Sequence, residues 1–273
     1  MEYKIVFSDL DGTFLNSAAK VSEENEKAVT IMRERGITFV PTTGRALSEI
    51  PNEVVDNPDV RYIITSNGSA VYDKAVDKFV FNTINKESLD FLLSVIKDMT
   101  VMICVHYNGR SYYSRPEMDN YEYYRMNDYY HSELIKFVDF VDVDMREFVS
   151  SLPEVCVCCL FFKYDDELDK CVDLLGKNGK FNVTSSVKYQ LEISRKGVTK
   201  GEAVRAFCSE HGISTDSAIS LGDSKNDIEL LKATGLSLAV KNAMLELLPY
   251  ADEVICSNNE HVADYVLRNF VLK

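Results

Sequence analysis

Two aspartates separated by one residue, Asp9 and Asp11, stand directly after a short hydrophobic run, Tyr3–Phe7. The run is apolar and rich in β-forming residues, which predicts a strand buried on both faces. Its carboxyl end would then carry two carboxylates, at the edge where open α/β sheets bind their ligands. Because desolvating an unpaired carboxylate is costly, we expect a metal ion or a lysine beside them.

Three further short loops carry residues of the same kind, and each follows an expected core strand or opens the helix next to one. The residues of interest are Thr43, Gly44 and Arg45 in the first loop, Lys200 in the second, and Asp223, Asn226 and Asp227 in the third. Parallel strands would bring these loops to one edge of the sheet.

Such a cluster would suit phosphate chemistry. Carboxylate oxygens gathered at one point favour a hard divalent cation, Mg²⁺, which leaves coordination places for water and a phosphate oxygen. Lys200, Thr43 and the loop amides would hold the remaining phosphate oxygens. A carboxylate can attack phosphorus to give an acyl phosphate, and Asp9 is the expected nucleophile. Asp11 would protonate the leaving oxygen and later take a proton from the attacking water.

The elements that would position these loops come in two separate stretches of chain. Strand and helix patterns alternate over the first 82 residues, and the same rhythm returns after Gly197, which predicts a parallel sheet. We expect Ser22 to cap a helix over Glu23–Arg35 and Thr199 to cap the helix that follows it. A strand over Val155–Phe162 is expected between the two stretches.

The middle of the chain has a different character. Asn108-Gly109 between two β-prone runs predicts a hairpin, and mixed strand and helix patterns follow it. The predicted fold class is therefore α/β, with a Rossmann-like parallel-sheet core made of residues 1–82 and 196–273. An α+β domain of residues 83–195 would be inserted into it.

Composition excludes several classes of partner. The 273 residues carry a formal net charge of -13, which argues against nucleic acid and against a polybasic membrane anchor. No apolar run approaches the ~18 residues of a membrane span, and no signal peptide is recognisable. The seven cysteines are an odd number and fit thiols better than a disulfide framework. We expect a cytoplasmic protein without nucleic-acid or membrane partners.

The cysteines Cys156, Cys158 and Cys159 are close enough in sequence to suggest a metal site. Buried strands often contain cysteine, however, and no histidine or second cysteine pair lies nearby at ligand spacing. We interpret this segment as a buried strand.

The four loop motifs, in this order, resemble those of the haloacid dehalogenase superfamily of aspartyl-phosphate enzymes. The long insert resembles the type C2 cap of the Cof-like sugar-phosphate phosphatases, as do Leu191-Glu192-Ile193 and Ser66-Asn67-Gly68. The resemblance implies that the insert sets substrate specificity.

The resemblance also implies a role for each motif residue. Asp9 would be the nucleophile and Asp11 the general acid and base, with Mg²⁺ held by the Asp9 side chain, the Asp11 backbone carbonyl and Asp223. Thr43, Gly44 and Lys200 would bind the phosphoryl group, Asn226 and Asp227 would orient the metal shell or the substrate, and Arg45 would contact the substrate.

Three functions are compatible with these residues. The first is a Mg²⁺-dependent phosphatase for a small phosphorylated metabolite, with a sugar phosphate favoured. The second is a phosphomannomutase-like phosphotransferase, which shares the acyl phosphate. The third is a phosphoacceptor switch like a response-regulator receiver, which needs no carboxylate two residues after the acceptor. The sequence does not determine the natural substrate or whether the protein is a monomer or a homodimer.

Overall fold

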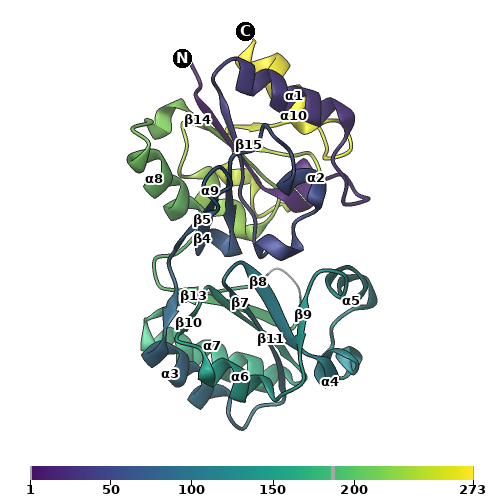
Figure 1. The fold of residues 1–273 in the computed structure, drawn as a ribbon, viewed down its shortest axis with the longest axis vertical. Coiled ribbons are helices and arrows are strands. Elements are labelled where there is room, and N and C mark those ends of the chain that lie inside the picture. The colour runs from purple at the N-terminus through teal and green to yellow at the C-terminus, as the bar shows by residue number, and fades with distance from the viewer. Residues whose placement is uncertain (1, 186–187, 273) are drawn as a thin grey trace. The chain divides into compact units, whose positions relative to one another are not determined.

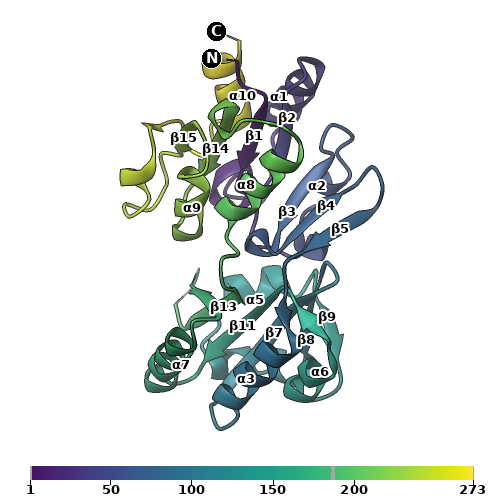
Figure 2. The same cartoon turned by 90° about the vertical axis from the view of Figure 1, so that its left-hand side faces the viewer.

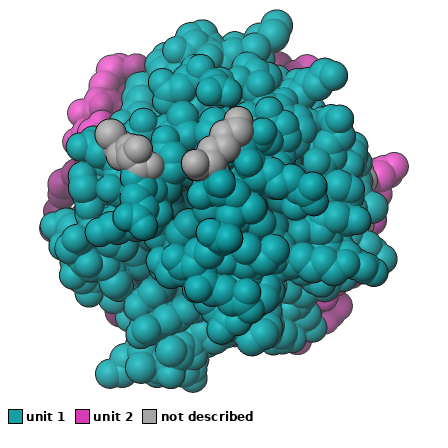
Figure 3. All heavy atoms as spheres, turned by 90° about the horizontal axis from the view of Figure 1, so that it is seen from above, with its two compact units in different colours: residues 1–44, 50–80, 199–273 teal, residues 45–49, 81–198 magenta. Residues whose placement is uncertain are grey.

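The computed structural model describes residues 2–185 and 188–272. The chain forms two compact units, which Figure 3 draws in different colours. The core unit contains residues 1–44, 50–80 and 199–273, and the inserted unit contains residues 45–49 and 81–198. The boundaries predicted from the sequence lie after residues 82 and 195, with the short segment 45–49 in the core.

The core unit is built on a parallel sheet with the strand order β16-β15-β14-β1-β2, seen in Figure 1. Its strands are β1 (Ile5–Ser8), β2 (Thr38–Pro41), β14 (Ala218–Gly222), β15 (Leu236–Ala239) and β16 (Glu253–Val254). A second, antiparallel sheet follows β2 in the chain and contains β3 (Tyr62–Thr65), β4 (Ala70–Asp73) and β5 (Lys78–Phe81). The parallel sheet confirms the predicted fold class.

Helices cover both faces of the parallel sheet (Figures 1 and 2). On one side lie α8 (Lys200–Glu210) and α9 (Ile228–Leu231), and on the other lie α1 (Glu23–Glu34) and α10 (Val262–Val266). A short helix, α2 (Asn52–Val55), precedes β3. Apolar side chains of α8 pack against β1, as where Phe207 meets Phe7 edge-on with ring centroids 5.9 Å apart.

The expected helix caps are present. The Ser22 side chain accepts a hydrogen bond from the backbone N–H of Asn25 at 3.3 Å, and Thr199 accepts one from Glu202 at 3.1 Å. Each cap satisfies a backbone donor that the first helical turn leaves without a partner. The Thr199 cap fixes the start of α8 and therefore the position of Lys200.

The inserted unit is built on a mostly antiparallel sheet with the order β12-β13-β11-β7-β8-β9. Its strands are β7 (Val101–Tyr107), β8 (Arg110–Ser114), β9 (Asp139–Val141), β11 (Val157–Phe162), β12 (Phe181–Thr184) and β13 (Gln190–Arg195). The predicted hairpin at Asn108-Gly109 connects β7 to β8, and both residues have the positive φ angles, 49° and 76°, that a tight hairpin turn requires.

One face of this sheet is covered by helices (Figures 1 and 2). The helices of the unit are α3 (Lys86–Ile96), α4 (Arg115–Met118), α5 (Asp128–Leu134), α6 (Met145–Ser151) and α7 (Asp165–Asn178). Buried residues of α3, α6 and α7 form one apolar cluster with alternate residues of β7 and β11, including Ile103, Cys158 and Leu160. The intervening residues of these strands therefore face the opposite side of the sheet.

The strand expected over Val155–Phe162 is divided in two. Glu154–Val155 (β10) pairs with Ile84–Asn85 (β6), whereas β11 pairs with β7 and β13. The chain changes partners at Cys156, whose backbone N–H donates to the carbonyl of His106 at 2.8 Å. The strand propensity of the residues does not predict such a change of partner.

Candidate active site

Parallel pairing brings the predicted loops to one edge of the core sheet. β1 lies between β14 and β2, and its last residue, Ser8, is level with Leu221 and Pro41 in the neighbouring strands. Asp9 follows β1 directly, and Asp223 follows β14 directly. Both aspartates therefore leave the sheet side by side at its carboxyl edge, as the sequence predicts.

Lys200 forms the centre of the site. Its Nζ lies 2.6 Å from Oδ1 of Asp9 and 2.7 Å from Oδ1 of Asp227, and the lysine is 1% exposed. An ammonium group in the first turn of a helix is unfavourable for the helix dipole, so the two carboxylates must compensate it. Although burial would lower the pKa of Lys200, Asp227 and Asp9 raise it above its usual value, so the lysine is charged.

The charges around Lys200 do not balance. Carboxylate oxygens of Asp9, Asp223 and Asp227 lie within 4.8 Å of one another. Asp223 also accepts a hydrogen bond from the Thr13 hydroxyl at 3.0 Å. Three carboxylates around one ammonium leave an excess of negative charge in a buried place, which favours a further cation.

The pKa values of two carboxyl groups reflect this excess. Burial raises the pKa of Asp9 well above its usual value, and neighbouring carboxylates add to the effect while Lys200 opposes it. Burial and the charge of Asp227 raise the pKa of Asp223 to about 6. A divalent cation between these groups would lower the pKa of both carboxyl groups. Oxygen atoms are the ligands that Mg²⁺ prefers. The donor set therefore fits Mg²⁺.

Asp227 has a different environment from Asp9 and Asp223. Its Oδ1 binds Lys200, and its Oδ2 accepts the backbone N–H groups of Asp223 and Ser224, each at 3.1 Å. Both oxygens are thus engaged within the protein. Asp227 thereby fixes the position of Lys200 and of the loop after β14.

The loop after Asp9 is held close to Asp223. Gly12 has φ +73°, and a Cβ placed on it would lie 2.6 Å from Oδ2 of Asp223. Asn242 donates to the Gly12 carbonyl at 2.7 Å. Asp11, in the same loop, is exposed to solvent, and its charge adds to the raised pKa of Asp9. Only glycine accommodates both the backbone angle and the close approach.

A second polar group contains Thr43, Gly44 and Asn226. The Thr43 carbonyl accepts the backbone N–H of Asn67 at 3.0 Å, and the Asn226 side chain donates to Oδ1 of Asn67 at 3.1 Å. A Cβ on Gly44 would lie 3.1 Å from the same oxygen. Asn67 thus joins the loops after β2 and β14.

Asn67 and Thr13 are the residues of this site that sequence reasoning did not assign. The left-handed backbone of Ser66 and Asn67, with φ of 53° and 55°, is uncommon for residues other than glycine and often marks functional positions. In the sequence, Asn67 was marked only as part of the triplet Ser66-Asn67-Gly68, which contributed to the family resemblance.

Arg45 is grouped with the inserted unit rather than with the core. Its Nη1 donates to the backbone carbonyl of Glu49 at 2.6 Å. Arg45 is therefore not among the polar residues that the core unit brings together.

Comparison with known proteins identifies the family. The family described as haloacid dehalogenase-like hydrolase matches residues 6–267. A putative phosphatase of Buchnera aphidicola is 26% identical over 285 residues, which cover 98% of this chain and 96% of the relative. The 5-amino-6-(5-phospho-D-ribitylamino)uracil phosphatase YcsE of Bacillus subtilis is 24% identical over 272 residues, covering 100% and 97%.

Solved structures show the same fold. The haloacid dehalogenase subclass IIB sugar phosphatase BT4131 has a TM-score of 0.81 and 18% identity, and the match covers 99% of this chain and 100% of that one. The chain therefore belongs to the haloacid dehalogenase-like hydrolases, and it is a phosphatase. This confirms the family resemblance seen in the sequence. Over the described residues, no helix combines the length and the apolar character that crossing a membrane requires.

We expect Lys200→Met to destabilise the core unit at neutral pH in the presence of a chelator. The substitution leaves the carboxylates of Asp9 and Asp227 buried without their counter-charge, which typically costs about 3–5 kcal/mol. Protonation removes that charge, so the loss should shrink as the pH falls through the raised pKa of Asp9. Urea unfolding at several pH values measures the effect. An equal loss at every pH would show that packing, not charge, is responsible. Lys232→Met, at an exposed ion pair, is the control.

Proposed function

We propose that this phosphatase hydrolyses small phosphomonoesters through a phosphorylated Asp9, with Mg²⁺ as cofactor. The observation that carries the proposal is the buried group in which Lys200 binds Asp9 and Asp227 beside Asp223. In this group the carboxylate that we propose as nucleophile lies next to a cation, which would offset the repulsion between the nucleophile and the phosphate.

The first step is attack of an Asp9 carboxylate oxygen on phosphorus, which forms an acyl phosphate and breaks the ester bond. Lys200 binds Oδ1 of Asp9, which would orient the carboxylate for the attack. Asp11 would give a proton to the leaving oxygen. Its exposure to solvent is compatible with proton exchange between the two steps.

In the second step, Asp11 would take a proton from a water molecule, which then attacks the acyl phosphate and regenerates Asp9. Thr43, Gly44 and Lys200 are proposed to hold the phosphate oxygens. Asn226, fixed through Asn67, would orient the substrate from the loop after β14.

Mg²⁺ would be held by the side chains of Asp9 and Asp223 and by the backbone carbonyl of Asp11. It would supply positive charge that offsets the negative charge of the phosphate. Asp227 would act from outside this ligand set, because its two oxygens already bind Lys200 and the backbone.

We infer that the substrate is a phosphorylated sugar or sugar-alcohol derivative in the cytoplasm. Two similarities support this class: BT4131 is described as a sugar phosphatase, and YcsE acts on a phosphoribityl compound. The seven cysteines are free thiols, as expected in a reducing compartment. The inserted unit, including Arg45, is proposed to select among such substrates.

Asp9→Asn should lower kcat for phosphate release by about 10³-fold or more, because the amide cannot act as the nucleophile. Phosphate release from a panel of phosphorylated sugars, sugar alcohols and nucleotides is the measurement. Asp98→Asn, at an exposed ion pair, should have wild-type rates. Hydrolysis that persists in Asp9→Asn would contradict the phosphorylated aspartate.

The same assays separate the alternative functions. Transfer of phosphate to a sugar with little release would indicate the phosphotransferase. A phosphorylated protein that persists for many minutes with Mg²⁺ would indicate the phosphoacceptor switch.

Mg²⁺ should raise the Tm of the wild-type protein and should be needed for activity. A ligand that binds only the folded state at 100-fold its Kd adds about 2.7 kcal/mol, which corresponds to a shift of about 5–10 °C for a protein of this size. Asp223→Asn should greatly reduce the shift, whereas Asp98→Asn should keep it. Full activity in excess chelator would overturn the metal assignment.

A further inference from the structure

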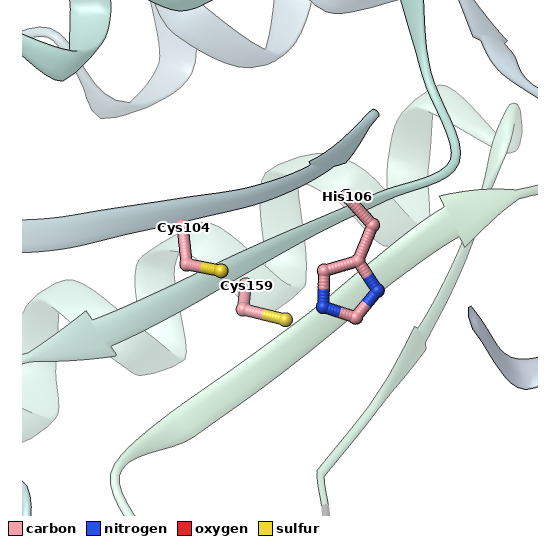
Figure 4. Close-up of side chains that lie close together, drawn as sticks. All are labelled: Cys104, His106 and Cys159. Carbon is pink, nitrogen blue, oxygen red and sulfur yellow. The ribbon is translucent and has the colours of Figure 1, made fainter. Parts of the chain in front are cut away.

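Three side chains outside the phosphatase site meet on the face of the inserted sheet opposite the apolar cluster of α3, α6 and α7 (Figure 4). Cys104 and His106 lie two residues apart on β7 and therefore face the same side. Cys159 of β11 is directly opposite Cys104 in the antiparallel pairing. None of the three belongs to the apolar cluster beneath α3, α6 and α7.

The three side chains converge on one point. A sulfur atom from each cysteine and a ring nitrogen of His106 lie within 4.8 Å of one another. Figure 4 shows both sulfur atoms and one ring nitrogen directed toward the space between them. All three residues are buried, with exposed fractions of 0% for Cys104, 5% for His106 and 6% for Cys159.

A carboxylate lies beside this group. Oε2 of Glu49 is 3.7 Å from Nε2 of His106 and accepts the backbone N–H of Ala46 at 2.8 Å. Glu49 is itself 4% exposed. It is supplied by the segment 45–49, which the contacts assign to the inserted unit. Glu192 of β13 pairs with Cys159 in the sheet and adds further negative charge nearby.

Other cysteines of the unit have no such surroundings. Burial in apolar positions raises the pKa of Cys156 and of Cys171 to about 12, as expected for packing residues. Cys104, by contrast, lies within 3.4 Å of the Ser111 hydroxyl and close to Cys159 and His106. Although burial opposes it, the hydrogen bonds from these two residues lower the pKa of Cys104 to about 6.

We propose that Cys104, His106 and Cys159 bind a thiophilic divalent cation, with Zn²⁺ as the reference ion and the Glu49 carboxylate beside His106. Two sulfurs and an imidazole are ligand types that Zn²⁺ takes in proteins, and Mg²⁺ does not use sulfur. The ion differs in kind from the one proposed at Asp9.

The geometry requires only a small adjustment. Zn–S bonds of about 2.3 Å in a tetrahedral site place two sulfurs about 3.8 Å apart. The observed separation of the two sulfurs, at most 4.8 Å, would therefore contract by about 1 Å or less, which side-chain rotation can supply. The burial of the group is typical of a structural site rather than a catalytic one.

The role of the site would be to fix Glu49 and its segment to the sheet. Residues 45–49 follow Gly44 in the chain, and the contact between Glu49 and His106 joins this segment to β7. A metal bound to His106 would fix the imidazole in the orientation of that contact. It would thereby stabilise the inserted unit independently of phosphatase chemistry.

Titration of the reduced, metal-free full-length protein with Co²⁺ tests the proposal. Cobalt bound to thiolates gives an intense near-ultraviolet charge-transfer band, which carboxylate ligands cannot produce. We expect the band to saturate at one equivalent of Co²⁺ and to disappear when Zn²⁺ is added. Zn²⁺ should also raise the Tm.

Variants locate the site. Cys104→Ser and Cys159→Ser should each abolish the saturable band, and His106→Asn should weaken Co²⁺ binding by about tenfold or more while both thiols remain. Cys158→Ala is the matched control, because it removes the neighbouring cysteine from the opposite face of the sheet and should keep the band. Circular dichroism confirms that each variant is folded.

Asp223→Asn separates this proposal from the proposed function, because it should lose the Mg²⁺ effect and keep the cobalt–thiolate band. Absence of the band in the wild-type protein would overturn the cysteine–histidine site. So would an unchanged band in folded Cys104→Ser, or a Cys104–Cys159 disulfide that forms in place of metal binding.

Discussion

The arrangement of the core unit depends on one buried ion group, the Lys200 ammonium between the carboxylates of Asp9 and Asp227. None of these charges could be buried alone, because each would then bear the full cost of desolvation. Together they still leave negative charge in excess, since Asp223 lies beside them. The fold thus keeps a position where added positive charge is favourable, and a phosphatase that handles an anionic substrate needs such a position.

The secondary structure determines where the residues of this ion group lie. β1 and β14 are adjacent and parallel, so Asp9 and Asp223 leave the sheet at the same level. The Thr199 cap sets the first residue of α8, and Lys200 is that residue. The inserted unit has its own sheet and its own apolar cluster, so its construction does not draw on the core of the phosphatase site.

Much of this site was predictable because its residues are marked locally. Asp9 and Asp223 follow apolar runs that read as buried strands, and parallel pairing then brings them together. Asn67 could not be assigned in this way, because its role arises from contacts with loops far away in the sequence. The same holds for Cys159. Its neighbours in the sequence include no further metal ligand at suitable spacing, whereas the pairing of β11 with β7 brings Cys104 and His106 next to it. Periodicity predicts which residues are buried, but register decides which of them meet.

The order of the strands has a consequence for how the protein is made. β1 emerges first from the ribosome, yet it lies between β2 and β14, and β14 begins only at Ala218. Until β14 is synthesised, one edge of β1 lacks its strand partner. Until residue 200 has been synthesised, Asp9 also lacks Lys200. The inserted unit, complete by Val198, can fold during this interval. The nascent chain therefore acquires the ion group of Asp9, Lys200 and Asp227 only after the inserted unit has been translated.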